Sequence, residues 1–265
     1  MQPLAWCSRP TTSAASLTKA PRDLVWDGLL NVRDLGGHPT NDGDETQFGR
    51  IVRADTVRRL SDKGWRALVD YGIRTIVDLR TNRELEEDQP AELPVDVVHV
   101  QAIEERDDVP AEVEAAAEKA PDLATGTRDV YLIMLERFKP NFARAVAAVA
   151  NAAEGGVVVH CAGGKDRTGL VTALLLRLAG VPIDDIAADY ALSEERLRPR
   201  HELWLAEAET EVERERLRRF TATPAAAMVG VLEELERRYG GVEAYLRAGG
   251  APDDIGERVR ARLRD

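Results

Sequence analysis

Along the first two thirds of the chain, the spacing of apolar and polar residues changes repeatedly between a pattern typical of strands and one typical of helices. Short apolar runs rich in β-branched residues predict strands at positions 49–54, 73–79, 95–100 and 157–160. Segments with apolar residues three and four apart predict helices at 62–71, 109–120, 128–138 and 142–153. Strands that alternate with helices indicate an α/β fold with a central, mostly parallel sheet flanked by helices. The last of these strands is the most apolar, so we expect it at the centre of the sheet.

The remainder of the chain carries a helical pattern throughout. It predicts helices at 169–179, 183–192, 193–220, 225–239, 242–246 and 253–263. Neither an internal repeat nor a linker rich in Pro, Gly or Ser divides the sequence, so we expect a single domain over residues 22–265. Residues 1–21 lack the basic start and apolar stretch of a signal peptide, and we expect a disordered leader there.

Composition narrows the class of protein. Hydrophobic residues make up 44% of the chain and charged residues 31%, which supplies a sizeable core and excludes a wholly disordered chain. The net charge of −11 argues against nucleic-acid binding. No apolar run approaches the ~20 residues of a membrane span. The two cysteines, Cys7 and Cys161, are too few for a disulfide framework or a zinc site, and they suit a reducing, cytoplasmic compartment.

The segment with the most specific chemistry joins the predicted central strand to the next helix. A chain that leaves a buried strand and turns at once into a helix points several backbone N–H groups at one spot, where they can bind an anion. Gly163 and Gly164 allow the dihedral angles of such a turn, and Arg167 offers a planar fork for two phosphate oxygens. This field favours the thiolate form of Cys161, a nucleophile. The alternative is that Cys161 is an ordinary buried cysteine.

The sequence of this loop is His160-Cys-Ala-Gly-Gly-Lys-Asp-Arg-Thr-Gly169. It resembles the phosphate-binding loop of the cysteine-dependent protein tyrosine phosphatases. The similarity is strongest to the atypical bacterial branch of IphP-type enzymes, which includes a secreted mycobacterial phosphatase. Further segments of that branch recur here in the same order: Asn31-Val-Arg-Asp-Leu-Gly-Gly37, Arg53-Ala-Asp55, Ile76-Val-Asp-Leu-Arg80 and Arg238-Tyr-Gly-Gly-Val-Glu-Ala-Tyr245. The resemblance runs from about Leu24 to the C-terminus and implies the fold of that superfamily.

The resemblance also implies a role for each residue of the loop. Cys161 would attack phosphorus in line and form a phosphocysteine intermediate, which water then hydrolyses. Arg167 and the loop amides would hold the equatorial oxygens, and Thr168 would donate a hydrogen bond to the sulfur. His160 would orient the loop from beneath, unless it is simply a core residue. The substrate-binding part of the loop comprises Ala162, Gly163, Gly164, Lys165 and Thr168.

The proton donor is the point at which the chain departs from the better-known tyrosine phosphatases. Those enzymes protonate the leaving oxygen with the aspartate of a Trp-Pro-Asp loop, and this tripeptide does not occur here. Asp166, inside the phosphate loop, is the nearest candidate, and the resemblance favours it. Alternatively, Asp166 only stabilises the helix N-terminus. Asp78 and Asp34 are reserve candidates, and Arg33 and Arg80 beside them either contact substrate or form salt bridges.

Two further features bear on the substrate. Lys165 occupies a position that is also lysine in phosphoinositide phosphatases, which hints at polyanionic lipid head groups; the alternative is a solvated charge. The segment Ser193–Phe220 is either a solvated helix or, by resemblance to the mycobacterial relative, a helical lid over the site. Trp204 and Leu205 would form the apolar underside of such a lid.

Together these observations predict a phosphatase that needs neither metal nor cofactor. Its substrates would be phosphotyrosine and, beyond that, phosphoserine, phosphothreonine or phosphoinositides. Two alternatives remain open. A thiolate-based arsenate reductase or sulfurtransferase is disfavoured, because arsenate reductases use further cysteines as resolving partners and only Cys7 is available. A pseudophosphatase that binds phosphoproteins would not need Cys161, Asp166 and Arg167 together. The sequence predicts no oligomeric state, and it leaves export without a signal peptide open, as in the mycobacterial relative.

Overall fold

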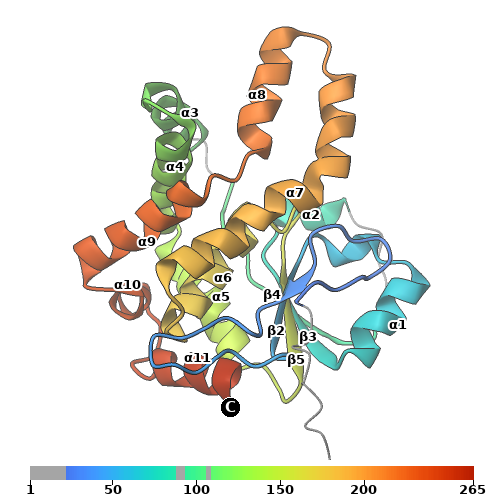
Figure 1. Cartoon of the computed structure of the whole chain (residues 1–265), viewed down its shortest axis with the longest axis vertical. Helices are drawn as coiled ribbons and strands as arrows, with labels where there is room; N and C mark the ends of the chain where they lie inside the picture. Colours follow the sequence, from blue (N-terminus) through green and yellow to red (C-terminus); the bar gives the residue numbers. More distant parts are fainter. Residues whose placement is uncertain (1–21, 88–92, 106–108) are drawn as a thin grey trace, which may run out of the picture.

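A five-stranded sheet forms the centre of the molecule. The structure is a computed structural model that describes residues 22–87, 93–105 and 109–265, so the predicted leader and Cys7 lie outside the described residues. Figure 1 shows the sheet in the lower middle of the molecule, and its strand order is β1-β2-β5-β3-β4. The four longer strands are parallel, and the short first strand is antiparallel to its neighbour. The strands are β1 (Arg33–Asp34), β2 (Ile51–Ala54), β3 (Ile73–Asp78), β4 (Asp96–His99) and β5 (Gly156–His160).

Strand β5 is central and buried along its whole length, as its apolar sequence predicts. Val157 and Val159 face the larger of two cores, whereas Val158 faces the smaller one. This alternation places one layer of apolar side chains on each face of the sheet. The smaller core contains Trp26 from the N-terminal segment and Leu68 from α1 (Asp62–Asp70).

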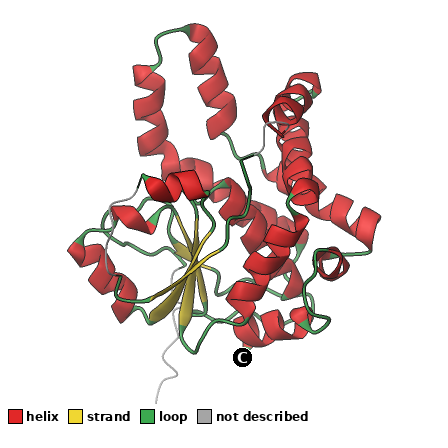
Figure 2. Cartoon of the chain, turned by 180° about the vertical axis from the view of Figure 1, so that it is seen from behind, coloured by secondary structure: helices red, strands yellow, loops and turns green. Residues whose placement is uncertain are grey.

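Most helices pack on the other face of the sheet (Figure 2). The α/β architecture, mostly parallel sheet and helical C-terminal half are therefore as predicted. The remaining helices described are η1 (Val57–Arg59), α2 (Asn82–Glu86), α3 (Val109–Lys119), α4 (Leu123–Arg137), α5 (Lys139–Ala150), α6 (Asp166–Leu178), α7 (Ile183–Glu207), α8 (Glu211–Thr221), α9 (Ala225–Tyr239), α10 (Val242–Ala248) and α11 (Ile255–Arg264).

The predicted boundary between helices at residues 192 and 193 is wrong. Helix α7 continues through it and past Pro199, because Ser193 is buried and accepts a hydrogen bond from Arg33 (3.3 Å) instead of capping a new helix. The break comes later, where the hydroxyl of Thr210 accepts from the amide of Glu213 (3.1 Å) and begins α8. The short strand β1 was also not predicted, since its two residues fall in a segment that reads as a loop.

The end of α7 and the whole of α8 form a hairpin that rises above the sheet (Figure 1). Trp204 lies between His201 and Phe220 in this hairpin, with ring centroids 5.5 and 6.4 Å away. The segment predicted as a lid, Ser193–Phe220, therefore consists of two parts that pack differently. Its first turns are packed into the body of the molecule, as buried Ser193 shows, and only the hairpin projects.

A buried ionic cluster joins α7 to the edge of the sheet. Asp189 of α7 accepts hydrogen bonds from Arg33 Nε (2.8 Å) and from Arg53 Nη1 (2.7 Å). All three side chains are at most 1% exposed. Burial and the neighbouring Arg53 lower the pKa of Arg33 to about 9, so it stays charged near pH 7. Burial alone would raise the pKa of Asp189, but the two arginines hold it well below its usual value.

Removing the charge of Asp189 should therefore destabilise the protein strongly. In Asp189→Asn two guanidinium groups remain buried without a carboxylate, a situation that costs ~3–5 kcal/mol of unfolding free energy. The matched control is Glu195→Gln, an exposed acid on the same helix, which should change stability by about 0.5 kcal/mol or less. Urea unfolding of both variants at pH 7 measures the difference. Equal stabilities would show that the cluster does not hold α7 in place.

Candidate active site

The loop Cys161–Lys165 leaves the carboxyl end of β5 and enters the N-terminus of α6 directly. Gly164 has φ +64°, and a Cβ there would lie 2.3 Å from the carbonyl oxygen of Ala54. The turn therefore requires glycine at this position, as predicted. Gly163 does not share the requirement: its φ is not positive, and a Cβ would meet nothing closer than 4.0 Å. The expectation that both glycines serve the backbone turn is thus wrong for Gly163.

The carbonyl groups of three loop residues, Ala162, Gly163 and Gly164, point outward and accept hydrogen bonds from neighbouring segments. Ala162 O accepts from the amide of Thr56 (3.2 Å). Asn31 Nδ2 donates to the carbonyl oxygens of Gly163 (3.0 Å) and Gly164 (3.1 Å). A further hydrogen bond to Gly164 O comes from Arg53 Nη2 (2.7 Å). The side chains of Asn31 and Arg53 thereby connect the loop to the buried cluster around Asp189.

The amide groups of the loop from Ala162 to Lys165, unlike these carbonyls, have no hydrogen-bond partner among the described residues. With the carbonyls held outward, these amides face the inside of the turn, where the helix N-terminus adds its partial positive charge. The loop is therefore a preformed cradle for an anion. Cys161, Gly164 and Lys165 are buried, whereas Ala162 is exposed and Gly163 half-buried, so the cradle is open to solvent on one side.

Arg167 is fixed at the rim of this cradle by a residue that the sequence does not single out. Glu84 accepts from Arg167 Nη1 (2.5 Å) and Nη2 (2.8 Å), which is a bidentate ion pair. Glu84 itself is held by a capping box with Thr81 at the start of α2. Burial would raise the pKa of Glu84, but Arg167 and the amide of Thr81 lower it to about 2. The arginine is thus pre-oriented by a fixed carboxylate.

Cys161 lies at the base of the loop and is only 2% exposed. It belongs to the larger apolar core, so its burial alone fits the alternative of an ordinary core cysteine as well as that of a nucleophile. Thr168, in the first turn of α6, has a buried hydroxyl that makes no hydrogen bond to the described residues. The predicted hydrogen bond from Thr168 to the sulfur is therefore not formed in this structure.

His160, Asp78 and Arg80 lie together at the ends of the two central strands. Asp78 accepts from Arg80 Nε (3.0 Å) and Nη2 (2.8 Å), and its Oδ2 lies 3.5 Å from His160 Nε2. Burial lowers the pKa of His160, which keeps the imidazole neutral near pH 7. Its Nδ1 lies 3.3 Å from the carbonyl oxygen of Cys161. The contact fits the supporting role predicted for His160, and Arg80 is salt-bridged.

Asp34, the other reserve candidate, is not brought to the loop. Its carboxylate accepts hydrogen bonds from the amides of Gly36 (2.6 Å) and Gly49 (2.7 Å) and from the hydroxyl of Tyr71 (2.6 Å). Gly49 precedes the amino end of β2, whereas the phosphate loop lies at the carboxyl ends of the parallel strands. Asp34 therefore organises the turn around β1, and its proposed reserve role as proton donor is wrong. The neighbouring Arg33 is likewise a salt-bridge partner in the Asp189 cluster.

Asp166 and Lys165 stand at the junction of the loop and α6. Asp166 Oδ1 accepts from the hydroxyl of Tyr131 (2.5 Å) and lies 3.5 Å from Lys165 Nζ. Lys165 is buried rather than solvated, contrary to one expectation. Its ammonium donates to the carbonyl oxygen of Phe220 and lies 4.6 Å from the centre of the Phe220 ring. The phosphate loop thus contacts the base of the projecting hairpin directly.

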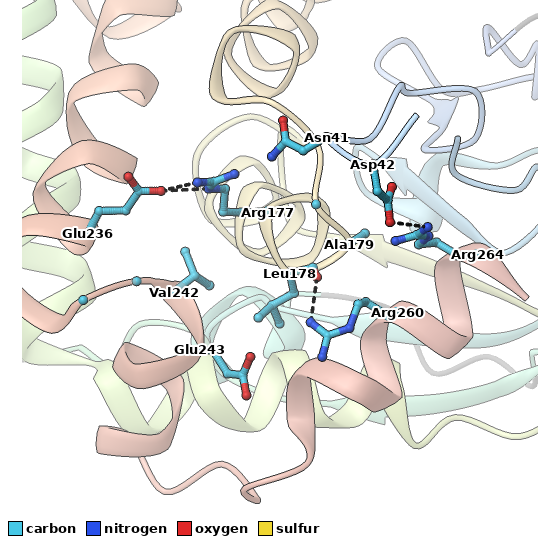
Figure 3. Close-up of a pocket in the computed structure, with 13 residues that line it drawn as sticks. Asn41, Asp42, Arg177, Leu178, Ala179, Glu236, Val242, Glu243, Arg260 and Arg264 are labelled. Atoms are coloured by element: carbon cyan, nitrogen blue, oxygen red, sulfur yellow. Dashed lines mark hydrogen bonds and ion pairs between the residues drawn. The ribbon is translucent and has the colours of Figure 1, made fainter. Parts of the chain in front are cut away.

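A separate hollow lies at the opposite end of α6 (Figure 3). Ion pairs of Arg177 with Glu236 and of Arg264 with Asp42 form its walls. A helix of 13 residues spans about 20 Å, which separates this hollow from Cys161. Within the described residues, no group of three or more His, Cys, Asp or Glu side chains could hold a metal ion, and no helix is long and apolar enough to cross a membrane.

Sequence reasoning missed the residues that hold the loop in shape. Asn31, Arg53 and Asp55 occur in the segments that carry the family resemblance, but the sequence does not show that they bind the loop or each other. Asp55 accepts from the amide of Asn31 (3.0 Å) and from Arg200 Nη2 (2.6 Å), so it orients the residue that binds the loop carbonyls. The Thr81-x-x-Glu84 spacing predicts a capping box, but it does not predict that Glu84 binds Arg167.

Comparisons with known proteins agree with this geometry. The model of the tyrosine phosphatase family matches residues 24–265. A tyrosine-protein phosphatase of Nostoc commune is 29% identical over 222 residues, which cover 80% of this chain and 74% of that protein. The triple specificity protein phosphatase PtpB of Mycobacterium tuberculosis is 29% identical over 271 residues, covering 89% of this chain and 97% of the relative. The chain belongs to the tyrosine phosphatase family, and it is a protein tyrosine phosphatase.

Proposed function

We propose that the enzyme hydrolyses phosphate monoesters through a phosphocysteine intermediate on Cys161. The observation that carries this proposal is the loop after Cys161: the carbonyls from Ala162 to Gly164 are held by outside donors, while the amides from Ala162 to Lys165 have no partner among the described residues. Such a cradle fits the three non-bridging oxygens of a phosphate. In the first step the Cys161 thiolate forms a bond to phosphorus as the bond to the leaving oxygen breaks.

Asp166 supplies the proton in this proposal. Its carboxyl donates a proton to the leaving oxygen, so the alcohol or phenol departs neutral and Asp166 becomes a carboxylate. In the second step the carboxylate takes a proton from water as water attacks phosphorus, the sulfur–phosphorus bond breaks, and phosphate and thiolate are released. The unpartnered hydroxyl of Thr168 is available to donate to that thiolate. Asp78 is less suited, because Arg80 holds its carboxylate.

The ion pair with Glu84 leaves Arg167 able to bind phosphate. Glu84 uses one hydrogen on each terminal nitrogen of the guanidinium, and five hydrogens are present in all. The Nε hydrogen and one terminal hydrogen remain along the adjacent edge, which is the pair that grips two oxygens of a phosphate. Glu84 therefore positions the arginine without competing for its binding edge.

The proposed substrates are phosphotyrosine in proteins, with phosphoserine, phosphothreonine and phosphoinositides as further candidates. The wider range is supported by the relative named as a triple specificity phosphatase and by Lys165 in the loop. Lys165 now faces Phe220, so a head group with a second phosphate would have to draw its ammonium away from the hairpin. Phosphopeptides and phosphoinositides assayed side by side with Lys165→Met test this range directly.

Replacing the nucleophile separates chemistry from binding. Cys161→Ser should abolish turnover of p-nitrophenyl phosphate, because a serine hydroxyl in this loop is not ionised. Binding of tungstate, measured by calorimetry, should be largely retained, since the loop amides and Arg167 are unchanged. Residual activity within about tenfold of the wild type, a barrier change of only ~1.4 kcal/mol, would contradict the covalent mechanism.

The variant Glu84→Gln tests the positioning of Arg167. We expect kcat/KM to fall about 10- to 100-fold, because a small displacement of a group that binds the transition state has effects of that size. Tungstate affinity should fall with it. Glu86→Gln, an exposed acid on the same short helix, is the matched control and should leave both quantities unchanged. If the two variants behave alike, Arg167 does not depend on Glu84.

The proton donor is tested with two substrates that differ only in the leaving group. Asp166→Asn should reduce kcat/KM for phenyl phosphate much more than for p-nitrophenyl phosphate, since the nitrophenolate leaves readily without a proton. The basic limb of the pH profile should flatten in the variant. Thermal unfolding must show that the variant is folded, because Asp166 also lies at a helix N-terminus. Equal losses on both substrates would assign Asp166 a structural role.

A further inference from the structure

Two buried tyrosines outside the loop lie in line with Asp166. Tyr131 on α4 is 2% exposed, and Tyr190 on α7 is 1% exposed. The hydroxyl of Tyr131 lies 2.5 Å from Asp166 Oδ1 and 2.8 Å from the hydroxyl of Tyr190. Their rings meet edge to face, with centroids 6.0 Å apart. Gly169 packs against the ring of Tyr190, which fixes this ring against the first turn of α6.

The direction of these hydrogen bonds follows from the number of protons. A tyrosine hydroxyl has one proton to donate, and Tyr131 gives its proton to the carboxylate of Asp166. Tyr190 must then donate to Tyr131. Burial and the nearby Asp166 raise the pKa of Tyr131 far above its usual value, and burial does the same for Tyr190, so both hydroxyls keep their protons. The series of hydrogen bonds therefore runs from Tyr190 through Tyr131 to Asp166.

The two oxygens of Asp166 are therefore not equivalent. Oδ1 receives the hydroxyl of Tyr131 and has Lys165 Nζ at 3.5 Å. Oδ2 makes no hydrogen bond to any described residue, and the side chain is 33% exposed. Oδ1 is thus hydrogen-bonded to the protein, whereas Oδ2 is free to contact solvent. A carboxyl group fixed in this way can present its free oxygen in one orientation.

We propose that Tyr131 is a positioning residue for proton transfer: its hydroxyl holds Oδ1 of Asp166, so that Oδ2 carries the proton to the leaving oxygen. Tyr190 in turn holds the hydroxyl of Tyr131. This inference rests on the proposed role of Asp166 as general acid. It adds the device that orients the acid, supplied by α4 and α7 instead of by a mobile loop.

Several charged groups face this carboxyl and bear on its pH dependence. Besides the two tyrosines, the ionisable side chains whose fields reach Asp166 or Tyr190 come from the loop, α6, β2 and α7: Lys165, Arg167, Arg53, Glu194 and His201. Burial, Lys165 and Arg200 lower the pKa of His201 to about 4, so it is neutral over the working range. Tyr131→Phe alters none of these side chains, which leaves the loss of one hydroxyl as a clean perturbation.

The variant Tyr131→Phe removes this hydroxyl and keeps the ring. We expect kcat/KM for phenyl phosphate to fall ~10- to 100-fold, part of the contribution of a general acid, with a smaller loss for p-nitrophenyl phosphate. Loss of a donor to a carboxylate favours its protonated form, so the basic limb of the pH profile should move to higher pH. In an Asp166→Asn background, Tyr131→Phe should have no further leaving-group-dependent effect.

The matched control is Tyr245→Phe. Tyr245 is also buried, and its hydroxyl donates to the carbonyl oxygen of Leu135 on the same helix α4 (2.8 Å). This variant loses an equally buried hydrogen bond, so it should share any fall in stability while keeping the wild-type substrate ratio and pH profile. If Tyr131→Phe does not fold, Tyr190→Phe replaces it, with a smaller change of the same sign expected.

These measurements distinguish the general-acid role of Asp166 from the positioning role of Tyr131. If Asp166→Asn shows the leaving-group dependence and Tyr131→Phe changes neither the substrate ratio nor the pH profile, Tyr131 has no positioning role and the proposal is wrong. An unchanged ratio in Tyr190→Phe overturns it in the same way if only that variant folds. If Asp166→Asn itself shows no leaving-group dependence, the general-acid role is wrong and the positioning role fails with it. A changed ratio in Tyr245→Phe would mean that the loss of any buried hydrogen bond to α4 has this effect, and the positioning role of Tyr131 would be wrong.

Discussion

Peptide geometry is the constraint on which this active site depends. Each peptide plane that turns its N–H group into the phosphate loop must turn its C=O group outward, where the carbonyl is buried in protein and needs a donor. The donors are the side chains of Asn31 and Arg53 and the amide of Thr56. Without them the same loop could gain hydrogen bonds by rotating its carbonyls inward, and the anion site would be lost. The cradle is thus made as much by its outer contacts as by its amides.

These outer contacts explain why helix α7 belongs to the site although it carries none of the reacting groups. Its Asp189 pairs with both Arg33 and Arg53, Arg33 donates to the amide oxygen of Asn31 (2.6 Å), and Arg200 binds Asp55. A buried cluster of this kind costs desolvation energy, which its ion pairs and hydrogen bonds must offset. Since the same helix continues into the projecting hairpin, and Phe220 of that hairpin contacts Lys165, the loop and the hairpin share one rigid support.

The fold could be predicted from the sequence, and candidate reacting residues could be proposed from it, because both have local signatures. The apolar run of β5, the capping serine of α1 and the loop motif each occupy a few consecutive residues. The residues that hold Arg167 and Asp166 could not be predicted, because their roles arise from pairs far apart in the chain, Glu84 with Arg167 and Tyr131 with Asp166. Ser193 shows the same limit: it resembles a helix cap, yet burial against Arg33 makes it a mid-helix residue.

A crystal structure with bound tungstate will show whether the loop is preformed for an oxyanion. We expect tungstate oxygens ~3 Å from the loop amides and from Arg167. The loop backbone should move by less than about 1 Å relative to the structure described here, as in other preorganised sites. Asn31 and Arg53 should keep their hydrogen bonds to the loop carbonyls. A loop that turns its carbonyls inward, or that binds tungstate only after Asn31 has left it, would show that the anion site is not preformed.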